Sequence, residues 1–265
     1  MLYKKVFLDN EADAYLEIYI ANKIDGFTRN ALLVIPGGGY QEICSEREGE
    51  PIAMAFMPYG YNAFVLHYSV NEPFPGQLIQ ASKAIKHIKD NAELYNIDPN
   101  MVFAIGFSAG GHLAASLGTM WHRKEIYDAV DMEFGYNKPT GMMLMYPVIS
   151  PTVHSISFKN LLKKENPSEE ELADCSIENY VDENSSPAYI IHTSNDEIVD
   201  VRNSLLLADV FRSKGIKFEM HIYPDAPHGV ALANEITKCG NDKWCNPAIH
   251  KWIENAVFWA RNCKS

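Results

Sequence analysis

Short apolar runs alternate with longer helical patterns along this chain, and no other feature constrains its fold as strongly. The apolar runs lie at residues 32–35, 63–66, 101–105, 142–145, 189–191 and 217–223. Most of them are apolar on both faces, which is typical of strands in a parallel sheet covered by helices on each side. The alternation therefore predicts an α/β protein with a mostly parallel central sheet and helices on both faces.

The segments between the runs have helical periodicity. Residues 77–95 place apolar side chains at three- and four-residue spacing, which forms one stripe. Asp98 and Pro99 are expected to stop this helix and start a turn. Residues 201–214 repeat the pattern and end at Gly215, a candidate αL cap. The last predicted helix covers residues 247–262, with Phe258 among the side chains on its expected buried face.

The length and the remaining segments predict one domain with two insertions. The 265 residues fit a single α/β domain over residues 1–265, and residues 14–20 alternate as an antiparallel edge strand would. Residues 121–140 and 154–187 interrupt the alternation, and Ser168 with Glu171 predicts a capping box in the second stretch. Insertions of this kind build lids or pocket walls. We therefore expect a small lid over the sheet.

The charge of the chain excludes some partners. Lys and Arg number 23 and Asp and Glu 34, which gives a formal net charge of −11. Such a surface repels nucleic-acid phosphates and anionic lipids, so neither nucleic acid nor a membrane is an expected partner. No stretch of 18 or more apolar residues occurs that could span a bilayer. The sequence leaves the oligomeric state open, a homo-oligomer included.

The cysteines and the N-terminal sequence indicate a cytoplasmic protein. The first 15 residues lack the apolar run of a signal peptide, and the 5 cysteines are scattered and odd in number. Reduced thiols are therefore expected. Cys239 and Cys245 could pair in an oxidising compartment, but they lack the close paired spacing of a zinc site.

Gly106-Phe107-Ser108-Ala109-Gly110 matches the pattern G-x-S-x-G. An apolar strand precedes it and a predicted helix over residues 110–120 follows it, as a nucleophile elbow requires. The sharp turn makes a serine hydroxyl protrude, and the helix N-terminus supplies free N–H groups and a positive dipole end. In this context Ser108 is interpreted as a nucleophile and not as a structural serine.

Gly37-Gly38-Gly39-Tyr40 follows the first buried strand. Consecutive glycines let the backbone approach a ligand closely, with N–H groups that no side chain shields. A plain tight turn would explain three glycines equally well. Together with the serine elbow, an oxyanion-hole loop is the better interpretation.

The histidine that would serve as base is predicted to be His228. It lies in a loop, next to Gly229 and just after the last strand, where the chain order Ser, Asp, His puts the base. His192 and His221 lie in strands and are interpreted as packed side chains. His112, four residues after the serine, is expected to pack or to form hydrogen bonds.

The acid should lie between these two residues and follow a strand. Asp196 is the first acidic residue after the run at 189–191, so it can orient the imidazole. Glu197 and Asp200 are the alternatives, and Asp200 has a second explanation as N-cap of the next helix.

Residues 45–51 allow two interpretations that the sequence does not separate. Ser45 and Glu48 could form a capping box, or Pro51 could occupy the first turn of a helix. Alternatively, Arg47 or Glu48 lines a pocket near the glycine loop.

With these motifs, the chain resembles the α/β-hydrolase superfamily. More narrowly it is similar to bacterial esterases and lipases of the acetylxylan-esterase-like group, which includes xylanase-B-associated esterases. The resemblance spans residues 31–260 and rests on segments 35–40, 45–51, 98–114, 192–199 and 223–229. It departs from the related lipase group, which has His-Gly-Gly-Gly where this chain has Pro36 before its glycines.

The resemblance implies roles for individual residues. Ser108 would attack an ester carbonyl, His228 would take its proton, and Asp196 would orient the imidazole. Backbone N–H groups of Ala109 and of Gly38 or Gly39 would bind the oxyanion. Tyr40 and Arg47 are candidates for the substrate pocket. Neither a metal nor an organic cofactor is expected.

Three functions remain to be compared. The expected one is a carboxylesterase that removes short acyl groups, acetyl above all, from small sugars or xylo-oligosaccharides. A serine peptidase of the prolyl-oligopeptidase type shares the chain order of the three residues, but 265 residues leave no room for its large gating domain. A non-catalytic binding protein on the same fold is the third, since a fold does not imply an activity.

Overall fold

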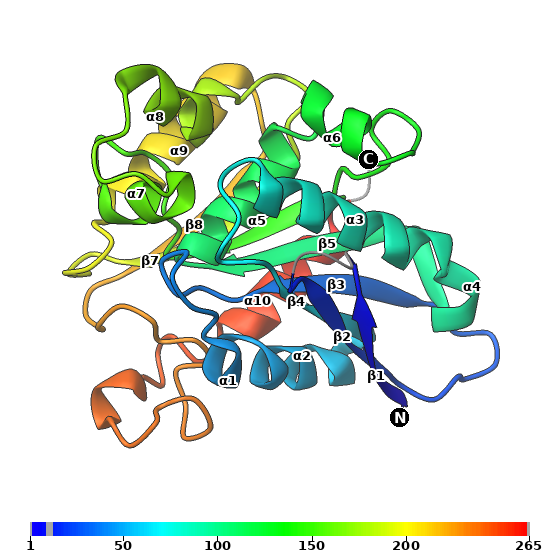
Figure 1. The fold of residues 1–265 in the computed structure, drawn as a ribbon. Helices are drawn as coiled ribbons and strands as arrows, with labels where there is room; N and C mark the ends of the chain where they lie inside the picture. The colour runs from blue at the N-terminus through cyan, green and yellow to red at the C-terminus, as the bar shows by residue number, and fades with distance from the viewer. Residues whose placement is uncertain (1, 9–12, 264–265) are drawn as a thin grey trace.

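An eight-stranded sheet forms the centre of the computed structural model, which describes residues 2–8 and 13–263. The order of its strands is β1-β2-β4-β3-β5-β6-β7-β8 (Figure 1). The strands are β1 (Leu2–Phe7), β2 (Tyr15–Ile20), β3 (Arg29–Ile35), β4 (Tyr61–His67), β5 (Ile97–Phe107), β6 (Gly141–Met145), β7 (Ala188–Thr193) and β8 (Phe218–Tyr223).

The pairing of the strands places one end of most of them at a common edge. The sheet is parallel from β4 through β3, β5, β6 and β7 to β8. Strand β2 is antiparallel to both β4 and β1. The carboxyl ends of the parallel strands therefore share one edge, where sites of open α/β sheets form. The predicted mostly parallel sheet is confirmed.

Helices cover both faces of the sheet (Figure 1). The helices are α1 (Ser45–Glu48), α2 (Glu50–Phe56), α3 (Gly76–Asp90), α4 (Ala92–Tyr95), α5 (Ala109–Thr119), α6 (Lys124–Ala129), α7 (Ile156–Leu162), α8 (Glu169–Cys175), α9 (Arg202–Lys214) and α10 (Trp252–Arg261), with short 3₁₀ turns at Met57–Tyr59, Ile177–Asn179 and Asp242–Trp244. One apolar cluster joins α3, α5 and α9 to the sheet, and a second joins α2 and α10 to its other face.

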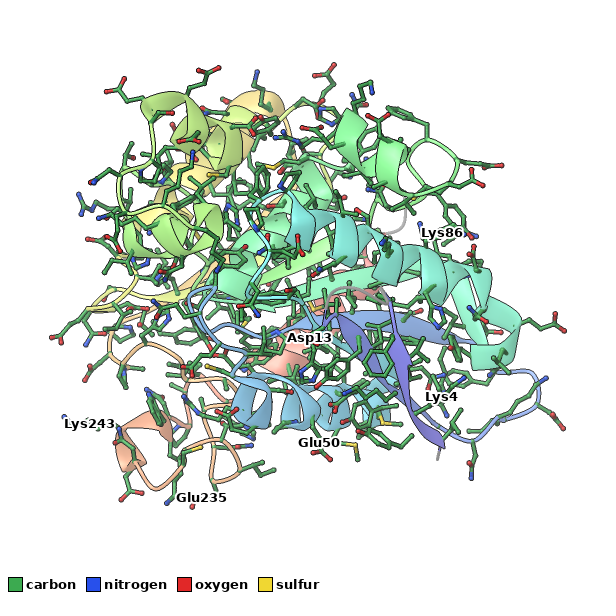
Figure 2. The ribbon with its side chains drawn as sticks, viewed as in Figure 1. Lys4, Asp13, Glu50, Lys86, Glu235 and Lys243 are labelled. Atoms are coloured by element: carbon green, nitrogen blue, oxygen red, sulfur yellow. The ribbon has the colours of Figure 1, made fainter. Side chains whose placement is uncertain are left out.

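The strands contribute to both clusters because successive side chains point to opposite faces. In β3, Leu33 and Ile35 belong to the first cluster, and Leu32 and Val34 to the second. All four are fully buried, which explains why the run is apolar at every position. Charged side chains such as Lys4, Glu50 and Lys243 lie at the periphery (Figure 2).

The strand predicted at residues 14–20 is antiparallel, as expected, but it is not at the edge. Strand β1 pairs outside it, in register from Leu2 opposite Ile20 to Phe7 opposite Tyr15. Five of the six residues of β1 are exposed, and two of them are lysines. Such a strand has no buried face, so no hydrophobic pattern reveals it. Lysines on an edge strand also discourage pairing with another chain.

Two predicted boundaries are wrong. Asp98 and Pro99 were expected to form a turn, but they lie inside β5, which begins at Ile97. The C-terminal helix begins at Trp252 and not at residue 247. Its Phe258 was expected on the buried face together with Val257; Val257 is buried, but Phe258 is 68% exposed and Trp259 is buried in its place.

The two insertions carry short helices. Residues 121–140 contain α6, and residues 154–187 contain α7 and α8, which lie near α9 (Figure 1). Helix α8 begins with the predicted capping box, in which the Ser168 side chain accepts from Glu171 N–H and the Glu171 side chain accepts from Ser168 N–H. Within the described residues, no helix combines the length and the apolar character that crossing a membrane requires.

Candidate active site

Ser108 lies in a strained turn between β5 and α5. Its φ is 53° and its ψ is −118°, which is unusual for a residue other than glycine. The turn depends on Gly106 and Gly110. A Cβ on Gly106 would lie 2.1 Å from the Gly110 carbonyl oxygen, and a Cβ on Gly110 would lie 2.2 Å from the Ile35 carbonyl oxygen. The two flanking positions therefore admit only glycine.

His228, in the loop after β8, reaches both Ser108 and Asp196. The distance between His228 Nε2 and Ser108 Oγ is 2.9 Å. On the other side of the ring, His228 Nδ1 lies 2.7 Å from Asp196 Oδ2. Three residues that follow β5, β7 and β8 thus meet at the carboxyl edge of the sheet. The structure brings together the three residues that the sequence analysis singled out.

Asp196 is held from two sides. Its Oδ1 accepts hydrogen bonds from the N–H groups of Ile198 and Val199, at 3.0 and 2.9 Å. Burial alone would raise the pKa of this carboxyl. Contacts with His192 and His228 and the hydrogen bond from Val199 outweigh burial and hold the pKa well below its usual range. Asp196 is therefore ionised at neutral pH.

The alternative acid Asp200 does not contact the imidazole. Its Oδ1 accepts from the N–H of Arg202, the first residue of α9, at 2.8 Å. Its other oxygen lies 3.0 Å from the Arg202 guanidinium. Asp200 thus lies just before the start of α9, but the N-cap of this helix is Val201 and not Asp200 as the second explanation expected. The carboxylate 2.7 Å from His228 belongs to Asp196.

The glycine loop packs directly on the elbow. A Cβ on Gly37 would lie 2.7 Å from the Phe107 carbonyl oxygen, a backbone atom, and 3.1 Å from Ser108 Cβ, so the loop could not come as close with any other residue. The N–H of Gly37 donates to Glu48 Oε2 at 2.8 Å. Within the described part of the chain, the N–H groups of Gly38, Gly39 and Ala109 have no hydrogen-bond acceptor. These three N–H groups remain the predicted oxyanion donors.

Tyr40 follows the three glycines, and its side chain packs in the core. Only 1% of it is exposed, and its hydroxyl lies 2.8 Å from His112 Nδ1. The second ring nitrogen of His112 lies 2.8 Å from the Cys175 carbonyl oxygen. His112 is thus a hydrogen-bonding residue, as expected. The side chain of Tyr40, a candidate for the pocket wall, is directed into the core.

Arg47 and Glu48 extend from α1 toward different loops. The Arg47 guanidinium donates to the carbonyl oxygens of Gly229 and Thr237. The Glu48 carboxylate accepts from Gly37 N–H and, at 2.7 Å, from the Tyr146 hydroxyl. The capping box considered for Ser45 and Glu48 is therefore absent, because the Glu48 side chain is directed away from the start of α1.

The other explanation for residues 45–51, a helix that begins around Pro51, is confirmed in α2. Pro51 lies in the first turn of α2, where its missing N–H costs no hydrogen bond.

Three residues at the site were not found from the sequence. Tyr146 follows β6 directly, and its ring lies edge-on to the His228 imidazole at 4.9 Å between centroids. Trp244 donates its indole N–H to the His228 carbonyl at 3.0 Å. Asn160 of α7 donates to the Gly39 carbonyl at 2.8 Å. Only Tyr146 carries a usable signal, its position after a parallel strand.

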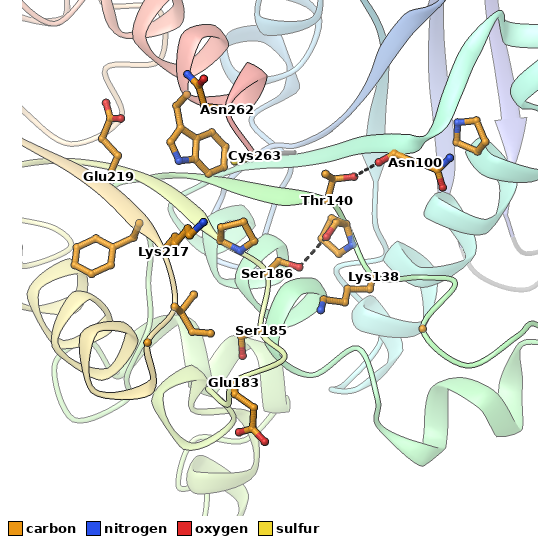
Figure 3. A pocket seen from close by; sticks show the side chains of 18 of the residues that line it. Asn100, Lys138, Thr140, Glu183, Ser185, Ser186, Lys217, Glu219, Asn262 and Cys263 are labelled. Atoms are coloured by element: carbon orange, nitrogen blue, oxygen red, sulfur yellow. Dashed lines mark hydrogen bonds between the residues drawn. The ribbon is translucent and has the colours of Figure 1, made fainter. Parts of the chain in front are cut away.

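A depression of about 750 Å³ lies away from this site (Figure 3). Thr140, Pro187 and Lys217, which line it, directly precede β6, β7 and β8. The depression therefore lies at the amino edge of the sheet, opposite the edge that carries Ser108. Its polar groups are partly paired with each other, since Thr140 donates to the Asn100 carbonyl at 2.8 Å.

All five cysteines lie within the described residues and are free, Cys239 and Cys245 included. Within the same residues, no group of three or more His, Cys, Asp or Glu side chains is placed to hold a metal ion.

A serine at a strand–turn–helix elbow, with a histidine and an acid from later loops at the carboxyl edge, defines an α/β hydrolase. Comparison with known families identifies the group within this class. Residues 16–211 match the family BD-FAE, so the chain belongs to that family. Residues 174–249 also match the dienelactone hydrolase family.

Curated relatives and solved structures agree with this assignment. The chain is 39% identical over 220 residues to endo-1,4-beta-xylanase B of Butyrivibrio fibrisolvens, covering 80% of this chain and 34% of that protein. It is 29% identical over 231 residues to an acetylxylan esterase of Xylanibacter ruminicola, covering 84% and 45%. The structure of an acetyl ester-xyloside bifunctional hydrolase from Caldicellulosiruptor lactoaceticus has a TM-score of 0.84 and 30% identity, covering 98% and 96%.

The two curated relatives are longer than this chain. The chain spans about a third to just under half the length of the two curated relatives. The relatives nevertheless agree with the predicted resemblance to the acetylxylan-esterase-like group.

Proposed function

We propose that this protein is a serine carboxylesterase that removes short acyl groups, acetyl above all, from sugars or xylo-oligosaccharides. The observation that carries the proposal is the unbroken hydrogen-bond chain from Ser108 through His228 to Asp196, with distances of 2.9 and 2.7 Å. A serine, a histidine and an acid joined in this order are typical of nucleophilic catalysis.

The partners of His228 determine its tautomer. The Asp196 carboxylate is ionised and can only accept, so His228 Nδ1 carries the proton and donates it. Nε2 is then free to accept the hydroxyl proton of Ser108, which lies within hydrogen-bond distance. This is the tautomer that a general base for a serine nucleophile requires.

The charge that develops on the ester oxygen needs N–H donors. Ala109 is the first residue of α5, so its N–H points out of the helix end, where the dipole favours an anion. Gly38 and Gly39 supply the opposite side from the loop after β3. The N–H of Gly37 is excluded, because it already donates to Glu48.

The reaction then proceeds in two halves. Ser108 Oγ attacks the carbonyl carbon while His228 accepts its proton, and the tetrahedral intermediate collapses to an acyl-enzyme. His228 gives the proton to the leaving alkoxide. A water molecule, deprotonated by His228, attacks the acyl-enzyme; the second tetrahedral intermediate then releases the acid, and His228 returns the proton to Ser108 Oγ. Asp196 stabilises the imidazolium in both halves.

The substrate class is supported by what two relatives are named for. One is an acetylxylan esterase and the other an acetyl ester-xyloside hydrolase. Both names combine an acetyl ester with a xylose-containing compound. We carry this combination to the present chain as part of the proposal.

A substrate panel tests the proposal. We expect hydrolysis of p-nitrophenyl acetate to exceed that of the octanoate, and release of acetate from acetylated xylo-oligosaccharides. A fluorophosphonate probe should label the wild type and fail to label Ser108→Ala, as seen by mass spectrometry of the intact protein. Ser213→Ala is a matched control, because that hydroxyl only contacts the Val210 carbonyl on the surface of α9.

Other outcomes point to other functions. A preference for octanoyl or longer esters would contradict the acetyl assignment. Cleavage of a prolyl amide without cleavage of acetyl esters would indicate a peptidase. Failure of the probe to label folded wild-type protein would indicate a non-catalytic protein.

A further inference from the structure

Glu48 is a buried carboxylate that the proposed reaction does not use. It is only 4% exposed and comes from the short helix α1. One of its oxygens accepts from the Gly37 N–H at 2.8 Å, and the other accepts from the Tyr146 hydroxyl at 2.7 Å. Glu48 therefore connects the glycine loop to the residue that follows β6.

Among the residues that the structure describes, no cation forms an ion pair with this carboxylate. The guanidinium of the adjacent Arg47 donates instead to the carbonyl oxygens of Gly229 and Thr237. Burial raises the pKa of Glu48, and the hydrogen bonds from Tyr146 and Gly37 offset this only in part. Burying a carboxylate on neutral donors costs free energy that an apolar side chain would avoid. What distinguishes Glu48 from such a side chain is its pair of acceptor oxygens.

The first oxygen determines the position of the glycine loop. Because the Gly37 N–H donates to Glu48, the peptide group between Pro36 and Gly37 cannot rotate without losing a buried hydrogen bond. The next two residues have φ values of 123° at Gly38 and 63° at Gly39, which few other residues adopt. Glycines of this kind have little intrinsic conformational preference. The carbonyl oxygens of Gly37 and Gly38 accept from backbone N–H groups of residues 41–44, and the bond to Glu48 adds a restraint at the start of the loop that these bonds do not supply.

The second oxygen determines the position of Tyr146. The Tyr146 hydroxyl donates to Glu48 and accepts from the Ala231 N–H at 3.1 Å. Ala231 lies three residues after His228, and the Tyr146 ring contacts the His228 ring edge-on. The same carboxylate thus restrains the loop that carries the base.

Arg47 restrains this loop from its other side. It donates to the carbonyl of Gly229, the residue after His228, and its guanidinium lies 3.7 Å from the centre of the Trp244 ring. Trp244 in turn donates to the His228 carbonyl at 3.0 Å. Two adjacent residues of α1 therefore contact the glycine loop and the histidine loop.

We propose that Glu48 is a positioning residue that fixes the oxyanion donors of the glycine loop relative to His228, with Arg47 as the second restraint on the histidine loop. The inference rests on the proposed function, because it assigns a task in acyl transfer at Ser108. Preorganised donors stabilise a transition state only when they are held in place before the reaction. The effect of Glu48 should therefore appear in kcat more than in KM.

Three variants separate the restraint from the charge. In Glu48→Gln, the side-chain carbonyl can still accept from Gly37 N–H, and the amide NH₂ can donate to the Tyr146 hydroxyl. Glu48→Leu removes both hydrogen bonds. Tyr146→Phe keeps the bond to Gly37 and removes the connection to the histidine loop. Glu46→Leu is the matched control, since Glu46 is an exposed carboxylate of the same helix.

The first measurement is hydrogen–deuterium exchange, which does not depend on activity. We expect Glu48→Leu to accelerate exchange at least 10-fold in peptides covering residues 37–44, with the core strands unchanged. Glu48→Gln, Tyr146→Phe and Glu46→Leu should retain wild-type exchange in those peptides, and Tyr146→Phe should accelerate it in peptides covering residues 229–233. Wild-type exchange in Glu48→Leu, or an equal increase throughout the protein, would overturn the inference.

The second measurement is the kinetics of p-nitrophenyl acetate hydrolysis. Glu48→Leu should lower kcat by about 10²–10³-fold, the loss typical of an oxyanion donor, with KM changed less than 3-fold. Glu48→Gln should stay within about 10-fold of the wild type. If Glu48→Gln lost as much kcat as Glu48→Leu while its exchange remained normal, the negative charge and not the restraint would matter, and the inference would be wrong.

The two proposals can fail separately. A wild type without esterase activity, but with the expected exchange pattern, would contradict the proposed function and leave the restraint by Glu48 supported. An active wild type with unchanged kcat in Glu48→Leu would contradict only the role of Glu48.

Discussion

Asp196 contacts His228 through one carboxylate oxygen only, since Oδ2 lies 2.7 Å from Nδ1 while Oδ1 faces away from the ring. Oδ1 accepts from the N–H groups of Ile198 and Val199. Both oxygens therefore have donors as partners. An asparagine at this position could satisfy only one side, because its amide nitrogen cannot accept a hydrogen bond.

This geometry predicts how the amide of Asp196→Asn would be oriented. The amide oxygen should take the place of Oδ1, where two N–H groups require an acceptor, so that the NH₂ group faces His228 Nδ1. The imidazole then carries its proton on Nε2 and cannot accept from Ser108. We expect kcat for p-nitrophenyl acetate to fall by about 10³–10⁴-fold, with a nearly unchanged KM.

The alternative acid provides the control. Asp200→Asn should leave kcat within about 3-fold of the wild type, because the Asp200 carboxylate contacts Arg202 and not His228. A large loss in Asp200→Asn with an active Asp196→Asn would show that the acid has been misassigned.

The elbow glycine Gly110 yields a prediction about both stability and activity. A Cβ there would lie 2.2 and 2.4 Å from the carbonyl oxygens of Ile35 and Pro36, which are backbone atoms of a central strand end. Gly110→Ala should lower the free energy of unfolding by about 3 kcal/mol and kcat/KM by about 10²-fold or more. Urea denaturation and ester hydrolysis measure the two effects.

Gly215→Ala distinguishes this clash from a general effect of losing a glycine. Gly215 has a φ of 73° and open space around it, so an alanine there costs about 1 kcal/mol of strain and contacts nothing. We expect unchanged activity in this variant. Equal activity losses in Gly110→Ala and Gly215→Ala would contradict the close packing of strand and elbow.

Much of the site followed from the sequence because each residue stands next to a recognisable strand. Ser108 follows β5, Asp196 follows β7 by three residues, and His228 follows β8 by five. In a parallel sheet, residues after different strands share one edge, so sequence order and strand positions suffice to bring these three together. No side-chain geometry was needed for that step.

The supporting contacts could not be predicted in the same way. Glu48 and Tyr146 are 98 residues apart, and their hydrogen bond depends on the direction that α1 takes after the glycine loop. Local rules allowed a capping box for Glu48, but its carboxylate makes tertiary contacts instead. Strand β1 escaped prediction for another reason, since it buries almost no side chain and leaves no periodic signal.

Burial of His112 predicts a stability that falls as the pH is lowered. Burial lowers the pKa of His112 to about 4, offset only in part by its hydrogen bond to the Cys175 carbonyl. The unfolded chain, with a histidine pKa of about 6.5, takes up a proton at a higher pH than the folded protein does. Stability is therefore fully present above about pH 6.5 and is lost as the pH falls toward 4. Between pH 7 and pH 5 the loss from His112 alone should be about 2 kcal/mol.

A glutamine at position 112 isolates this contribution. In His112→Gln, the amide can accept from the Tyr40 hydroxyl and donate to the Cys175 carbonyl, without a titrating group. The difference in unfolding free energy between pH 7 and pH 5, measured with urea, should be about 2 kcal/mol smaller in the variant. Burial also lowers the pKa values of His67, His87 and His154, which remain in both proteins. An equal pH dependence in both proteins would mean that His112 is not the source.

The face that α10 buries can be tested with two aromatic residues of the same helix. Trp252 is fully buried and donates its indole N–H to the Ala231 carbonyl at 3.0 Å, whereas Phe258 is 68% exposed. Trp252→Ala should cost about 3–5 kcal/mol of unfolding free energy, because it leaves a cavity and an unpaired carbonyl. Phe258→Ala should change stability by less than about 0.5 kcal/mol. Thermal or urea denaturation of both variants measures these losses, and a large loss in Phe258→Ala would contradict the exposure of this side chain.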